Sequence, residues 1–419
     1  MWLLNRMLRS VIKHGKLVIT DHDGKVYEYG PGSDPVRIRF TRKSTARRIA
    51  TDPGLGAGEA YMDGELVVEP PHDIRDMILL VKGAGARVGR PVDAPNPLHR
   101  MVDRALSRID QFNYRARANK NVKHHYDLTR QFYELFLDED RQYTMAYWQD
   151  GVQSLEQAQL DKKALIAAKL RLGPDMRVLD IGCGWGGLGL YLNRHYGCEV
   201  LGVSLAPDQV RFAQERAEAA GVAGKVRFEL MDYRDVSGQF DRITSVGMIE
   251  HVGARSFPEY FAKTFSLLAD DGIMLTHTIG RTGPPGRTDA WTRKHIFPGG
   301  YIPAMSELVT AMEQTGWKMG DIEVLRYHYA RTLHEWYNRT TAHQHEITAL
   351  YDERLFRMWQ FYLAGAEQAF AFDSMVNFHL QSVKRPGVLP MTRDYIAEEQ
   401  RRLGVAETAP DWHLSQAAE

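Results

Sequence analysis

The chain of 419 residues has few of the features that would place a protein outside the cell or across a membrane. Its only cysteines, Cys183 and Cys198, are too few for a disulfide framework and fit a reducing compartment. No apolar run approaches the roughly 18 to 20 residues of a membrane span, and the N-terminus lacks a small-residue cleavage site. The 53 basic residues balance 53 acidic ones, so no nucleic-acid partner is predicted. We therefore expect a cytoplasmic protein, or one that lies on the inner face of a membrane.

Turn and linker signals divide the chain. Alternating apolar residues on both sides of Asp23-Gly24 predict a hairpin over residues 17–29, and Asp63-Gly64 precedes another apolar strand. Residues 83–97 are rich in Gly, Pro and Ala without periodicity, as in a linker. We expect a small α+β domain over residues 1–85, a linker over 86–119, a larger domain with C-terminal helices over 120–400, and a tail over 401–419.

The first 16 residues, MWLLNRMLRSVIKHGK, interleave apolar residues at a spacing of three and four with positive charges only. This pattern is typical of a helix that lies in a lipid interface with its basic groups on anionic headgroups. The alternative is a terminal helix packed on its own domain. The two interpretations are compatible.

The most informative stretch is Arg177–Leu188, RVLDIGCGWGGL. Its first half is short, apolar and rich in β-branched residues, which predicts a buried strand of an α/β sheet. The glycines that follow allow a sharp turn in which a ligand can approach the backbone N–H groups closely. A helix from about Gly187 would place its positive end beside that turn. Asp180, at the end of the strand, can meet an ammonium group, a sulfonium or a ribose hydroxyl.

The strands that follow narrow the choice of ligand. The spacing G-C-G-W-G-G is not the dinucleotide fingerprint, and no G-K-[ST] follows. A strand over Glu199–Val203 ends at Ser204 without an acidic residue for both ribose hydroxyls. A strand over Lys225–Leu230 ends at Met231-Asp232-Tyr233, which offers a carboxylate and an aromatic plane for a purine. Ligand groups along one edge of a doubly wound sheet favour S-adenosylmethionine (SAM), with a nicotinamide or a plain nucleotide as the alternative.

Two further strands end in ionisable groups. A strand over Phe240–Val246 leads to Glu250, and a strand over Gly272–Ile279 carries His277 near its end. A lone histidine in a strand is more often a satisfied core residue, but two ionisable groups at the cofactor edge of a sheet favour chemistry. No H-x-x-x-H or C-x-x-C spacing is present, so we predict no metal site.

Three other segments each allow two interpretations. The aromatic-rich segment after Asn121 can be a helix that caps the sheet or the wall of an apolar acyl pocket. The loop over Gly280–Gly300 mixes basic residues with Trp291 and Phe297, and can grip a phospholipid headgroup or be a solvated flap. For the apolar stripe that includes Trp359 and Phe370 we predict core packing.

The chain resembles the cyclopropane-fatty-acyl-phospholipid synthases, a family that also includes the mycolic acid cyclopropane synthases. The resemblance rests on strings in the same order along nearly the whole chain: YMDGELVV, HYDLTRQFYELFLD, YTMAYW, VLDIGCGWGGL, DYRD, FDRITSVGMIEHVG, LTHTIG, HIFPGG and YARTLHEW. It implies an α/β fold with a doubly wound, seven-stranded, Rossmann-like SAM-dependent methyltransferase domain over residues 120–400, and a lipid- or membrane-interacting α+β domain over residues 1–85. It also implies an unsaturated membrane phospholipid as substrate, peripheral membrane contact and a homodimer.

Carried over residue by residue, the resemblance places the SAM contacts on Tyr143 and Thr144, within 178–186, within 204–209, and on Tyr233 with Arg234. The cofactor residues are then Tyr143, Thr144, Asp180, Gly182, Gly184, Trp185, Gly186, Ser204, Gln209, Tyr233 and Arg234. Members of the family hold a bicarbonate ion, which would here lie among Met145, Glu250, His277, Ile279 and Tyr329. The catalytic residues would be Glu250, His277 and Tyr329.

The chain departs from the family at two positions. Met145 replaces a cysteine of the usual YSCAYW, and Ala366 stands where members often have a cysteine that has been called catalytic. Methyl transfer to an alkene needs alignment and a dry pocket rather than a thiol, so the expected activity is cyclopropane formation on phospholipid acyl chains. One alternative is loss of a different proton, which gives a methyl-branched or methylene chain. The other is a lipid-binding homologue without catalysis.

Overall fold

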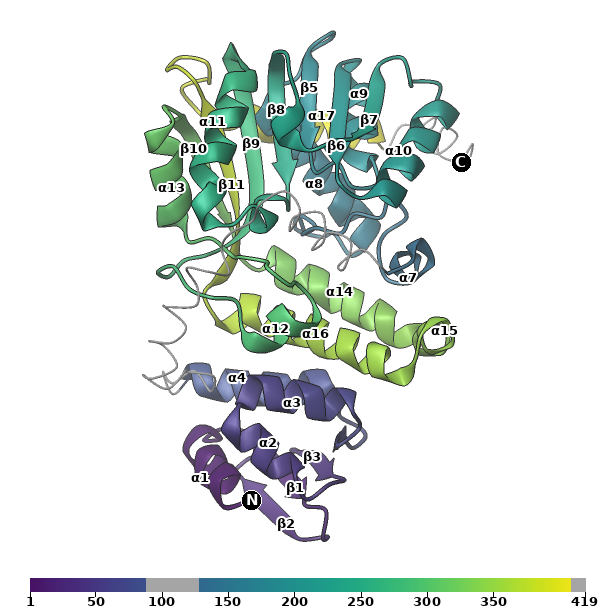
Figure 1. Cartoon of the computed structure of the whole chain (residues 1–419), viewed down its shortest axis with the longest axis vertical. Helices are drawn as coiled ribbons and strands as arrows, with labels where there is room; N and C mark the ends of the chain where they lie inside the picture. The colour runs from purple at the N-terminus through teal and green to yellow at the C-terminus, as the bar shows by residue number, and fades with distance from the viewer. Residues whose placement is uncertain (88–127, 408–419) are drawn as a thin grey trace.

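The structure is a computed structural model of the chain that describes residues 1–87 and 128–407. Most of the predicted linker, residues 88–119, lies outside the described residues, as do residues 408–419 of the predicted tail. The described part is elongated, with a large sheet at one end, a layer of helices in the middle and a small sheet at the other end (Figure 1).

The large sheet has seven strands in the order β10-β11-β9-β8-β5-β6-β7. Its central strands are parallel, whereas β11 is antiparallel to β9 and β10 is antiparallel to β11. The strands are β5 (Arg177–Ile181), β6 (Glu199–Ser204), β7 (Val226–Leu230), β8 (Phe240–Val246), β9 (Leu268–Arg281), β10 (Lys318–Leu325) and β11 (Met375–Val383). The strands predicted for β5 to β9 are confirmed, although β9 is longer than predicted.

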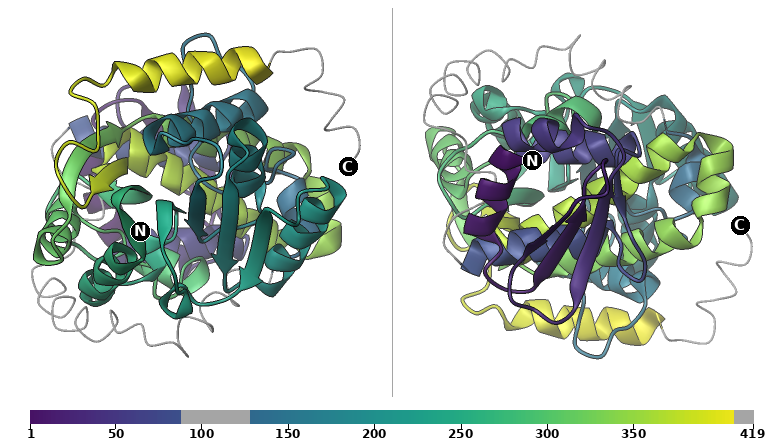
Figure 2. Two further views of the ribbon diagram at one scale, coloured as in Figure 1. Left: turned by 90° about the horizontal axis from the view of Figure 1, so that it is seen from above. Right: turned by 90° about the horizontal axis from the view of Figure 1, so that it is seen from below.

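Helices cover both faces of this sheet (Figure 2), so the predicted doubly wound α/β architecture is confirmed. One apolar core lies under α8 (Leu155–Leu170), α9 (Gly187–Tyr196), α10 (Pro207–Ala219) and α17 (Asp394–Glu407). The other lies under α11 (Phe257–Leu267) and α13 (Met305–Gln314). Short 3-10 turns at Tyr233–Asp235 (η1), Ile249–His251 (η2) and Ala254–Ser256 (η3) follow the strand ends.

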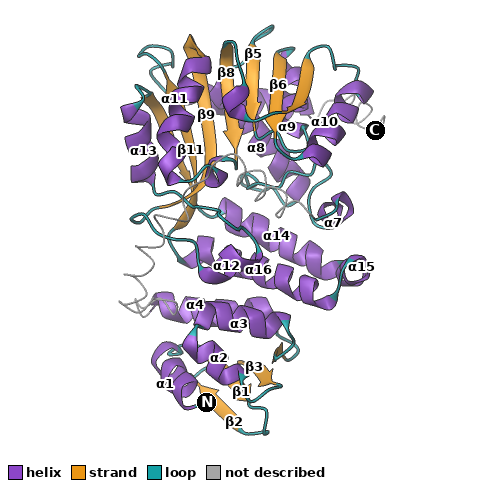
Figure 3. Ribbon diagram, viewed as in Figure 1, coloured by secondary structure: helices purple, strands orange, loops and turns teal. Residues whose placement is uncertain are grey.

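A helical layer lies below the carboxyl ends of the parallel strands (Figure 3). It contains α12 (Ala290–His295), α14 (His328–Ala342), α15 (Gln344–Leu350) and α16 (Glu353–Phe372), with the short α7 (Arg130–Glu134) beside it. The predicted core packing of the α16 stripe is confirmed, because Trp359 and Phe370 are buried. The layer therefore covers, with aromatic side chains, the edge of the sheet where ligands bind in this fold class.

The N-terminal part has a small sheet in the order β2-β1-β3-β4. Its elements are α1 (Trp2–Val11), β1 (Lys16–Thr20), β2 (Val26–Tyr29), β3 (Pro35–Phe40), α2 (Thr45–Thr51), α3 (Pro53–Met62), β4 (Leu66–Val68) and α4 (Ile74–Arg87). The predicted hairpin and the strand after Asp63-Gly64 are confirmed. Helices α3 and α4 pack against α16, and Arg75 donates to both carboxylate oxygens of Glu367 at 2.6 and 2.7 Å.

Helix α1 has one buried face and an exposed apolar end. Leu4, Leu8 and Val11 are buried against the rest of the N-terminal part, whereas Trp2 is 75% exposed and Leu3 is 49% exposed. The packing interpretation is confirmed, and contact with lipid stays a prediction. Within residues 1–87 and 128–407, no helix combines the length and the apolar character that crossing a membrane requires.

Candidate active site

A cavity lies at the carboxyl ends of β5, β6 and β8, beside the glycine turn. Ten of the predicted cofactor residues line it: Tyr143, Thr144, Asp180, Gly182, Gly184, Trp185, Ser204, Gln209, Tyr233 and Arg234. Gly186 does not line it. A Cβ at Gly186 would lie 2.7 Å from Ala213 and 2.9 Å from Phe228, so this glycine allows α9 to pack closely on α10 and β7.

The glycine turn has the backbone geometry that the sequence predicts. Gly182 and Gly184 have φ values of 83° and 55°, in the left-handed region that favours glycine. The N–H groups of Gly182 and Cys183 both donate to the carbonyl of Val203, which fastens the turn to the end of β6. Helix α9 begins at Gly187, as predicted. The turn thus brings backbone and the positive end of a helix to the cavity.

Asp180 is the buried acid of the cavity. It is 2% exposed, and its Oδ2 has no hydrogen-bond partner within the described part of the chain. Burial raises the pKa of Asp180 to about 7, against the opposing charge of Lys162. A buried carboxylate oxygen without a donor is costly, and a cationic or hydroxyl-bearing ligand would remove that cost. This orphaned oxygen therefore fits SAM, which carries such groups.

A second acid, Asp232, lies at the wall of the cavity. Asp232 and Arg234 form a two-point ion pair, with contacts of 2.9 Å at Nε and 2.6 Å at Nη2. The pair fixes the turn that contains Tyr233, whose ring lies 5.4 Å from that of Tyr260. The aromatic plane that the sequence predicts for a purine is thus held in place at the cavity wall.

A buried charge cluster beneath the cavity was not predicted. Lys162 is 1% exposed, lines the cavity, and donates to Oε1 of Gln142 at 2.7 Å and to Oγ1 of Thr144 at 2.9 Å. Burial lowers the pKa of Lys162 to about 7. Asp140 is held by Lys163 at 2.8 Å and by Arg216 at 2.6 Å. The available signal was the adjacent Lys162 and Lys163 directly before the apolar run 164–168 in α8, because buried lysines are rare without partners.

Glu250 is the second buried acid without a full set of partners. It lies in η2 and is 8% exposed. Its Oε1 accepts the N–H of Ile279 at 2.6 Å, whereas Oε2 has no hydrogen-bond partner among the described residues. Burial raises the pKa of Glu250 to about 7. The predicted neighbours Glu250 and Ile279 are therefore in direct contact.

The structure places His277 in a different hydrogen-bond network. Its Nε2 lies 3.2 Å from Nδ2 of Asn377, and its Nδ1 lies 2.9 Å from Nε2 of His379. Burial and the charges of Lys162 and Lys169 lower the pKa of His277 to about 3. Glu250 is bound to the backbone of β9 rather than to the ring of His277.

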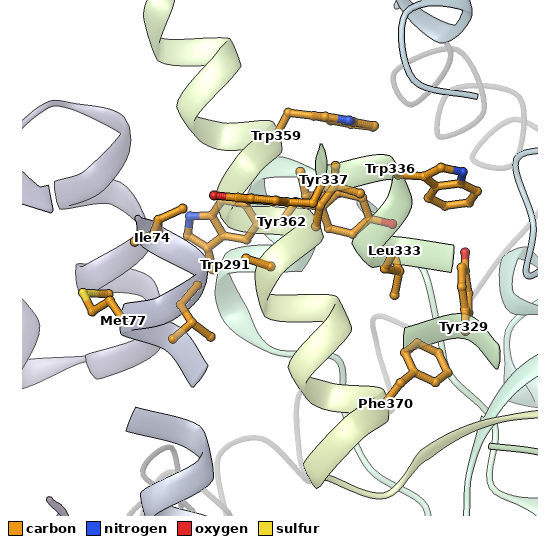
Figure 4. Close-up of a cluster of buried hydrophobic side chains, with 14 of the residues drawn as sticks. Ile74, Met77, Trp291, Tyr329, Leu333, Trp336, Tyr337, Trp359, Tyr362 and Phe370 are labelled. Atoms are coloured by element: carbon orange, nitrogen blue, oxygen red, sulfur yellow. The ribbon is translucent and has the colours of Figure 1, made fainter. Parts of the chain in front are cut away.

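The remaining predicted residues lie in an apolar cluster. Met145 and Tyr329 are buried in this cluster, and Ile279 packs against it. Figure 4 shows Tyr329 beside Trp336 and Phe370, with ring centroids 5.8 and 4.8 Å apart. Tyr329 therefore brings a hydroxyl into a cluster made mainly of aromatic and aliphatic side chains.

The aromatic-rich segment belongs to the same cluster. Phe132, Phe136 and Tyr143 pack on Trp336 of α14 and Trp359 of α16, with ring centroids 5.0 to 6.0 Å apart in the pairs 132–359, 136–336, 136–359 and 143–336. The segment thus fills the space between the glycine turn and the helical layer. Its role as the wall of an acyl pocket stays a prediction.

The long loop over residues 280–300 is docked rather than free. It contains α12, and Trp291 is 3% exposed between Gly58 of α3 and Phe361 of α16. Lys294 donates to Glu59 of α3. The interpretation as a solvated flap is wrong for this part of the loop, because its central helix is fixed to the N-terminal part.

Comparisons with known proteins place the chain among lipid-modifying methyltransferases. The family described as mycolic acid cyclopropane synthetase matches residues 113–380, and a domain of unknown function matches residues 3–82. The cyclopropane-fatty-acyl-phospholipid synthase of Escherichia coli (strain K12) is 38% identical over 339 residues, which cover 81% of this chain and 85% of that protein. A probable fatty acid methyltransferase of Pseudomonas putida is 32% identical over 385 residues, covering 89% and 94%.

A solved structure shows the same fold for the larger part of the chain. The cyclopropane synthase MmaA2 from Mycobacterium tuberculosis aligns with a TM-score of 0.60 and 29% identity, over 63% of this chain and 97% of that one. The mycolic acid cyclopropane synthase CmaA1, solved in complex with SAH and CTAB, aligns with the same values. The neighbours thus include an enzyme with the demethylated cofactor in place.

Proposed function

Because the chain belongs to the mycolic acid cyclopropane synthetase family, we propose that it transfers a methylene group from SAM to the cis double bond of an unsaturated phospholipid acyl chain, closing a cyclopropane ring. The observation that carries this proposal is that two buried carboxyl groups at the carboxyl ends of the parallel strands, Asp180 and Glu250, each have one oxygen without a partner in the described part of the chain. One lines the cofactor cavity, and the other lies at the carboxyl ends of β8 and β9.

SAM, when bound, supplies an electrophilic methyl carbon on a sulfonium. We propose that Asp180 and the backbone of the glycine turn hold its polar groups, and that Tyr233 faces the adenine. Lys162 lies at the inner wall of the same cavity. Its buried ammonium group is held by Gln142 and Thr144, so it is directed away from the bulk solvent.

An alkene is a weak nucleophile, so its reaction with a sulfonium depends on alignment and exclusion of water. The aromatic cluster of α7, α14 and α16 supplies a dry environment next to the cavity. Aromatic faces also attract the positive charge that develops on the acyl chain. We propose that Tyr143 and Trp336 lie nearest to that charge, because Tyr143 both lines the cavity and packs on Trp336 at 5.2 Å.

The proposed bicarbonate position fits Glu250 better than it fits His277. The partnerless Oε2 of Glu250, together with its raised pKa, fits a small ion that carries or accepts a proton. Bicarbonate, when bound, would supply a compact base near the reacting carbons. The ion would be surrounded by Met145, Ile279 and Tyr329. His277 would contact the ion only after the side chain of Asn377 had moved away from Nε2.

Met145 supports a second candidate product. Its side chain is fully buried in the apolar cluster, in place of the smaller cysteine of the resembled family. A change in volume at this point alters which carbon presents its hydrogen to the base. The same chemistry would then end in a methyl-branched or methylene chain, in line with relatives named as fatty acid methyltransferases.

We also propose that residues 1–85 bring the enzyme to the bilayer as a peripheral protein on the cytoplasmic side, and that it acts as a homodimer. The exposed Trp2 and Leu3 support the membrane contact, since Arg6, Arg9 and Lys13 lie on the same basic segment. An exposed apolar end with positive flanks is suited to a surface of anionic headgroups.

The proposal is tested by expressing the chain in bacteria that lack cyclopropane lipids. We expect unsaturated acyl chains to gain the mass of one CH2 group and to lose their double bond, as seen by gas chromatography and mass spectrometry of the fatty esters. Glu250→Gln should lower this product roughly 100-fold or more, because it removes a group that can hold or move a proton. The matched control is Glu65→Gln, a buried glutamate of the N-terminal part that leaves the site intact.

Folded, SAM-binding protein without any such product would overturn the proposal. Products that keep an alkene after gaining the CH2 would reject the ring and favour the Met145 alternative. If Glu65→Gln lost activity as fully as Glu250→Gln, the special role of Glu250 would be refuted.

A further inference from the structure

A row of polar side chains crosses three neighbouring strands of the large sheet. Glu323 of β10 lies opposite His379 of β11, which lies opposite His277 of β9. Residues directly opposite one another on adjacent strands place their side chains on the same face, about 4.5–5.5 Å apart at Cβ. His277 and His379 are almost fully buried, whereas the side chain of Glu323 is 25% exposed. The row therefore runs from the interior to the surface.

Lys169 of α8 completes the contacts along this row. Its Nζ lies 2.5 Å from Oε2 of Glu323 and 3.1 Å from Nδ1 of His379, and the side chain has no exposed area. His379 Nε2 lies 2.9 Å from His277 Nδ1, and His277 Nε2 faces the amide of Asn377 at 3.2 Å. These contacts form one unbroken chain from Asn377 to Glu323. A buried chain of this kind is costly unless each member is satisfied.

The hydrogen positions along the chain have two consistent patterns. With the amide nitrogen of Asn377 donating to Nε2 of His277, Nδ1–H of His277 donates to His379, and Nδ1–H of His379 donates to an uncharged Lys169. With the amide turned, every bond reverses, and Lys169 donates as an ammonium group. The amide of Asn377 offers a donor nitrogen or an acceptor oxygen according to its orientation, and Oδ1 has no partner among the described residues.

These two patterns differ by one proton. A proton can reach Nε2 of His277 once the amide of Asn377 has moved off that nitrogen, and Nδ1 of the ring then passes its own proton to Nε2 of His379. Nδ1 of His379 then passes its proton to Lys169, which becomes an ammonium group beside Glu323. Lys169 gives its extra proton to Glu323, and both rings are left with their proton at Nε2. One proton enters at the inner end and one leaves at the exposed carboxylate.

We propose that His379, Lys169 and Glu323 form a proton exit route that carries the proton released during ring closure from His277 to the surface. This inference rests on the proposed function, since methyl transfer followed by ring closure breaks the S–CH3 bond, the π bond of the alkene and one C–H bond. It forms two C–C bonds, leaves the S–C electron pair on sulfur and releases one proton per turnover. The dry aromatic cluster offers that proton no other polar chain from His277 within the described residues. His379 and Lys169 act through His277 and are positioning residues.

The inner end of the route lies close to the cofactor cavity. The carbonyl of His277 accepts the N–H of Gly247, which lines the cavity, at 2.9 Å. Burial, together with the charges of Lys162 and Lys169, lowers the pKa of His277, so a proton is not retained there. The other ionisable groups that face the route are Lys162 on α8, His328 on α14, Asp321 on β10 and Arg393 before α17. Arg393 pairs with both Asp321 and Glu323 at the surface end.

The test compares the full-length enzyme with His379→Gln, Lys169→Met and a control, Gln381→Met. Gln381 is 1% exposed on the same face of β11 and bonds the carbonyl of Lys169, but it lies outside the proton route. We expect the two route variants to lower kcat roughly 100-fold or more, the lower end of what a proton-transferring group contributes, with SAM affinity unchanged. Gln381→Met should keep kcat within about threefold of the wild type and accounts for local disturbance of packing.

Chemical rescue separates proton transfer from a structural role. In His379→Gly, added imidazole should raise kcat in proportion to its concentration, whereas the wild type and Gln381→Met should not respond. Nitrogen-15 NMR of the histidine rings should show one tautomer shared by His277 and His379, which changes at both rings in Lys169→Met. Unchanged kcat and pH profile in both route variants, or loss of activity without rescue, would refute the route. If the wild type gives no cyclopropane or branched product, the proposed function fails instead and the route falls with it.

Discussion

Gly187→Ala should displace the Asp140 carboxylate from its ion pairs with Lys163 and Arg216 under the glycine turn. A Cβ at this position would lie 2.1 Å from Oδ2 and 2.4 Å from Oδ1 of Asp140, at the first residue of α9. The carboxylate cannot move aside freely, because Lys163 holds one oxygen at 2.8 Å and Arg216 holds the other at 2.6 Å. To relieve the overlap, the Asp140 carboxylate must move by about 1 Å, which breaks its hydrogen bonds to Lys163 and Arg216. Each of these charged hydrogen bonds contributes about 1.5–3 kcal/mol to stability.

The expected loss of stability is therefore about 3–5 kcal/mol, the range seen when one partner of a buried ion pair is displaced. Burial raises the pKa of Asp140, but the charges of Lys163 and Arg216 outweigh it and hold that pKa well below its ordinary value. The carboxylate is then charged throughout the neutral range, and its stabilising contribution is present above its unfolded pKa and is lost only as the pH falls toward the folded value. The cost of Gly187→Ala should thus be the same at neutral and mildly acidic pH.

The assay is urea unfolding followed by circular dichroism, in a double-mutant cycle with Asp140→Ala. We expect the double variant to be no less stable than Asp140→Ala alone, because the clash needs the carboxylate. Gly365→Ala is the control, since it lies within α16 with nothing near its Cβ and should gain about 0.5–1 kcal/mol. Additive losses from Gly187→Ala and Asp140→Ala would refute the reasoning.

Two other predictions concern the cavity and the contact between α3 and α12. Since burial raises the pKa of Asp180 to about 7, protonation should weaken SAM binding by up to about tenfold per pH unit below that value. In calorimetry, the SAM affinity of Asp180→Asn should depend less on pH than that of the wild type. Equal slopes of affinity against pH in the two proteins would contradict a role of Asp180 in SAM binding. Gly58→Ala would place a Cβ 2.4 Å from Nε1 of Trp291 and should cost about 1–3 kcal/mol in urea unfolding. Gly54→Ala, in the same helix with open space around it, should cost less than Gly58→Ala, and equal costs would refute the contact.

The sequence predicted the parallel part of the large sheet and the cofactor edge because both depend on local patterns. Short apolar runs, each followed by glycine or by a polar ligand group, identify β5 to β8 and the turn at Gly182. The predicted cofactor residues that follow strand ends line the cavity because the carboxyl ends of parallel strands meet at one edge. Tyr143, Thr144 and Gln209 also line it, but they were predicted from the family resemblance. Gly186 is the predicted cofactor residue that does not line the cavity. A glycine can be needed because a ligand approaches the backbone or because a neighbouring side chain, here Phe228, does so. The sequence alone does not distinguish these two reasons.

The ion pairs beneath the cavity could not be predicted because their members are distant in the chain. Asp140 meets Arg216 only after α7, α9 and α10 have packed together. The strands β10 and β11 were missed for a related reason. In β11, polar residues interrupt the apolar run at Asn377, His379 and Gln381, which obscures a strand that is buried on both faces.

Those interruptions are themselves informative once the register is known. Asn377, His379 and Gln381 alternate along β11, so their side chains share one face of the strand. That face lies against β9 at His277 and Ile279, the two residues that the sequence places nearest to the chemistry. Burying three polar side chains on one face of a strand costs free energy unless they form hydrogen bonds, and such residues are retained where they make these bonds or take part in a reaction. Here Gln381 bonds the backbone of α8, whereas Asn377 and His379 bond the ring of His277. The polar positions of β11 therefore divide between a structural attachment and the surroundings of a single imidazole.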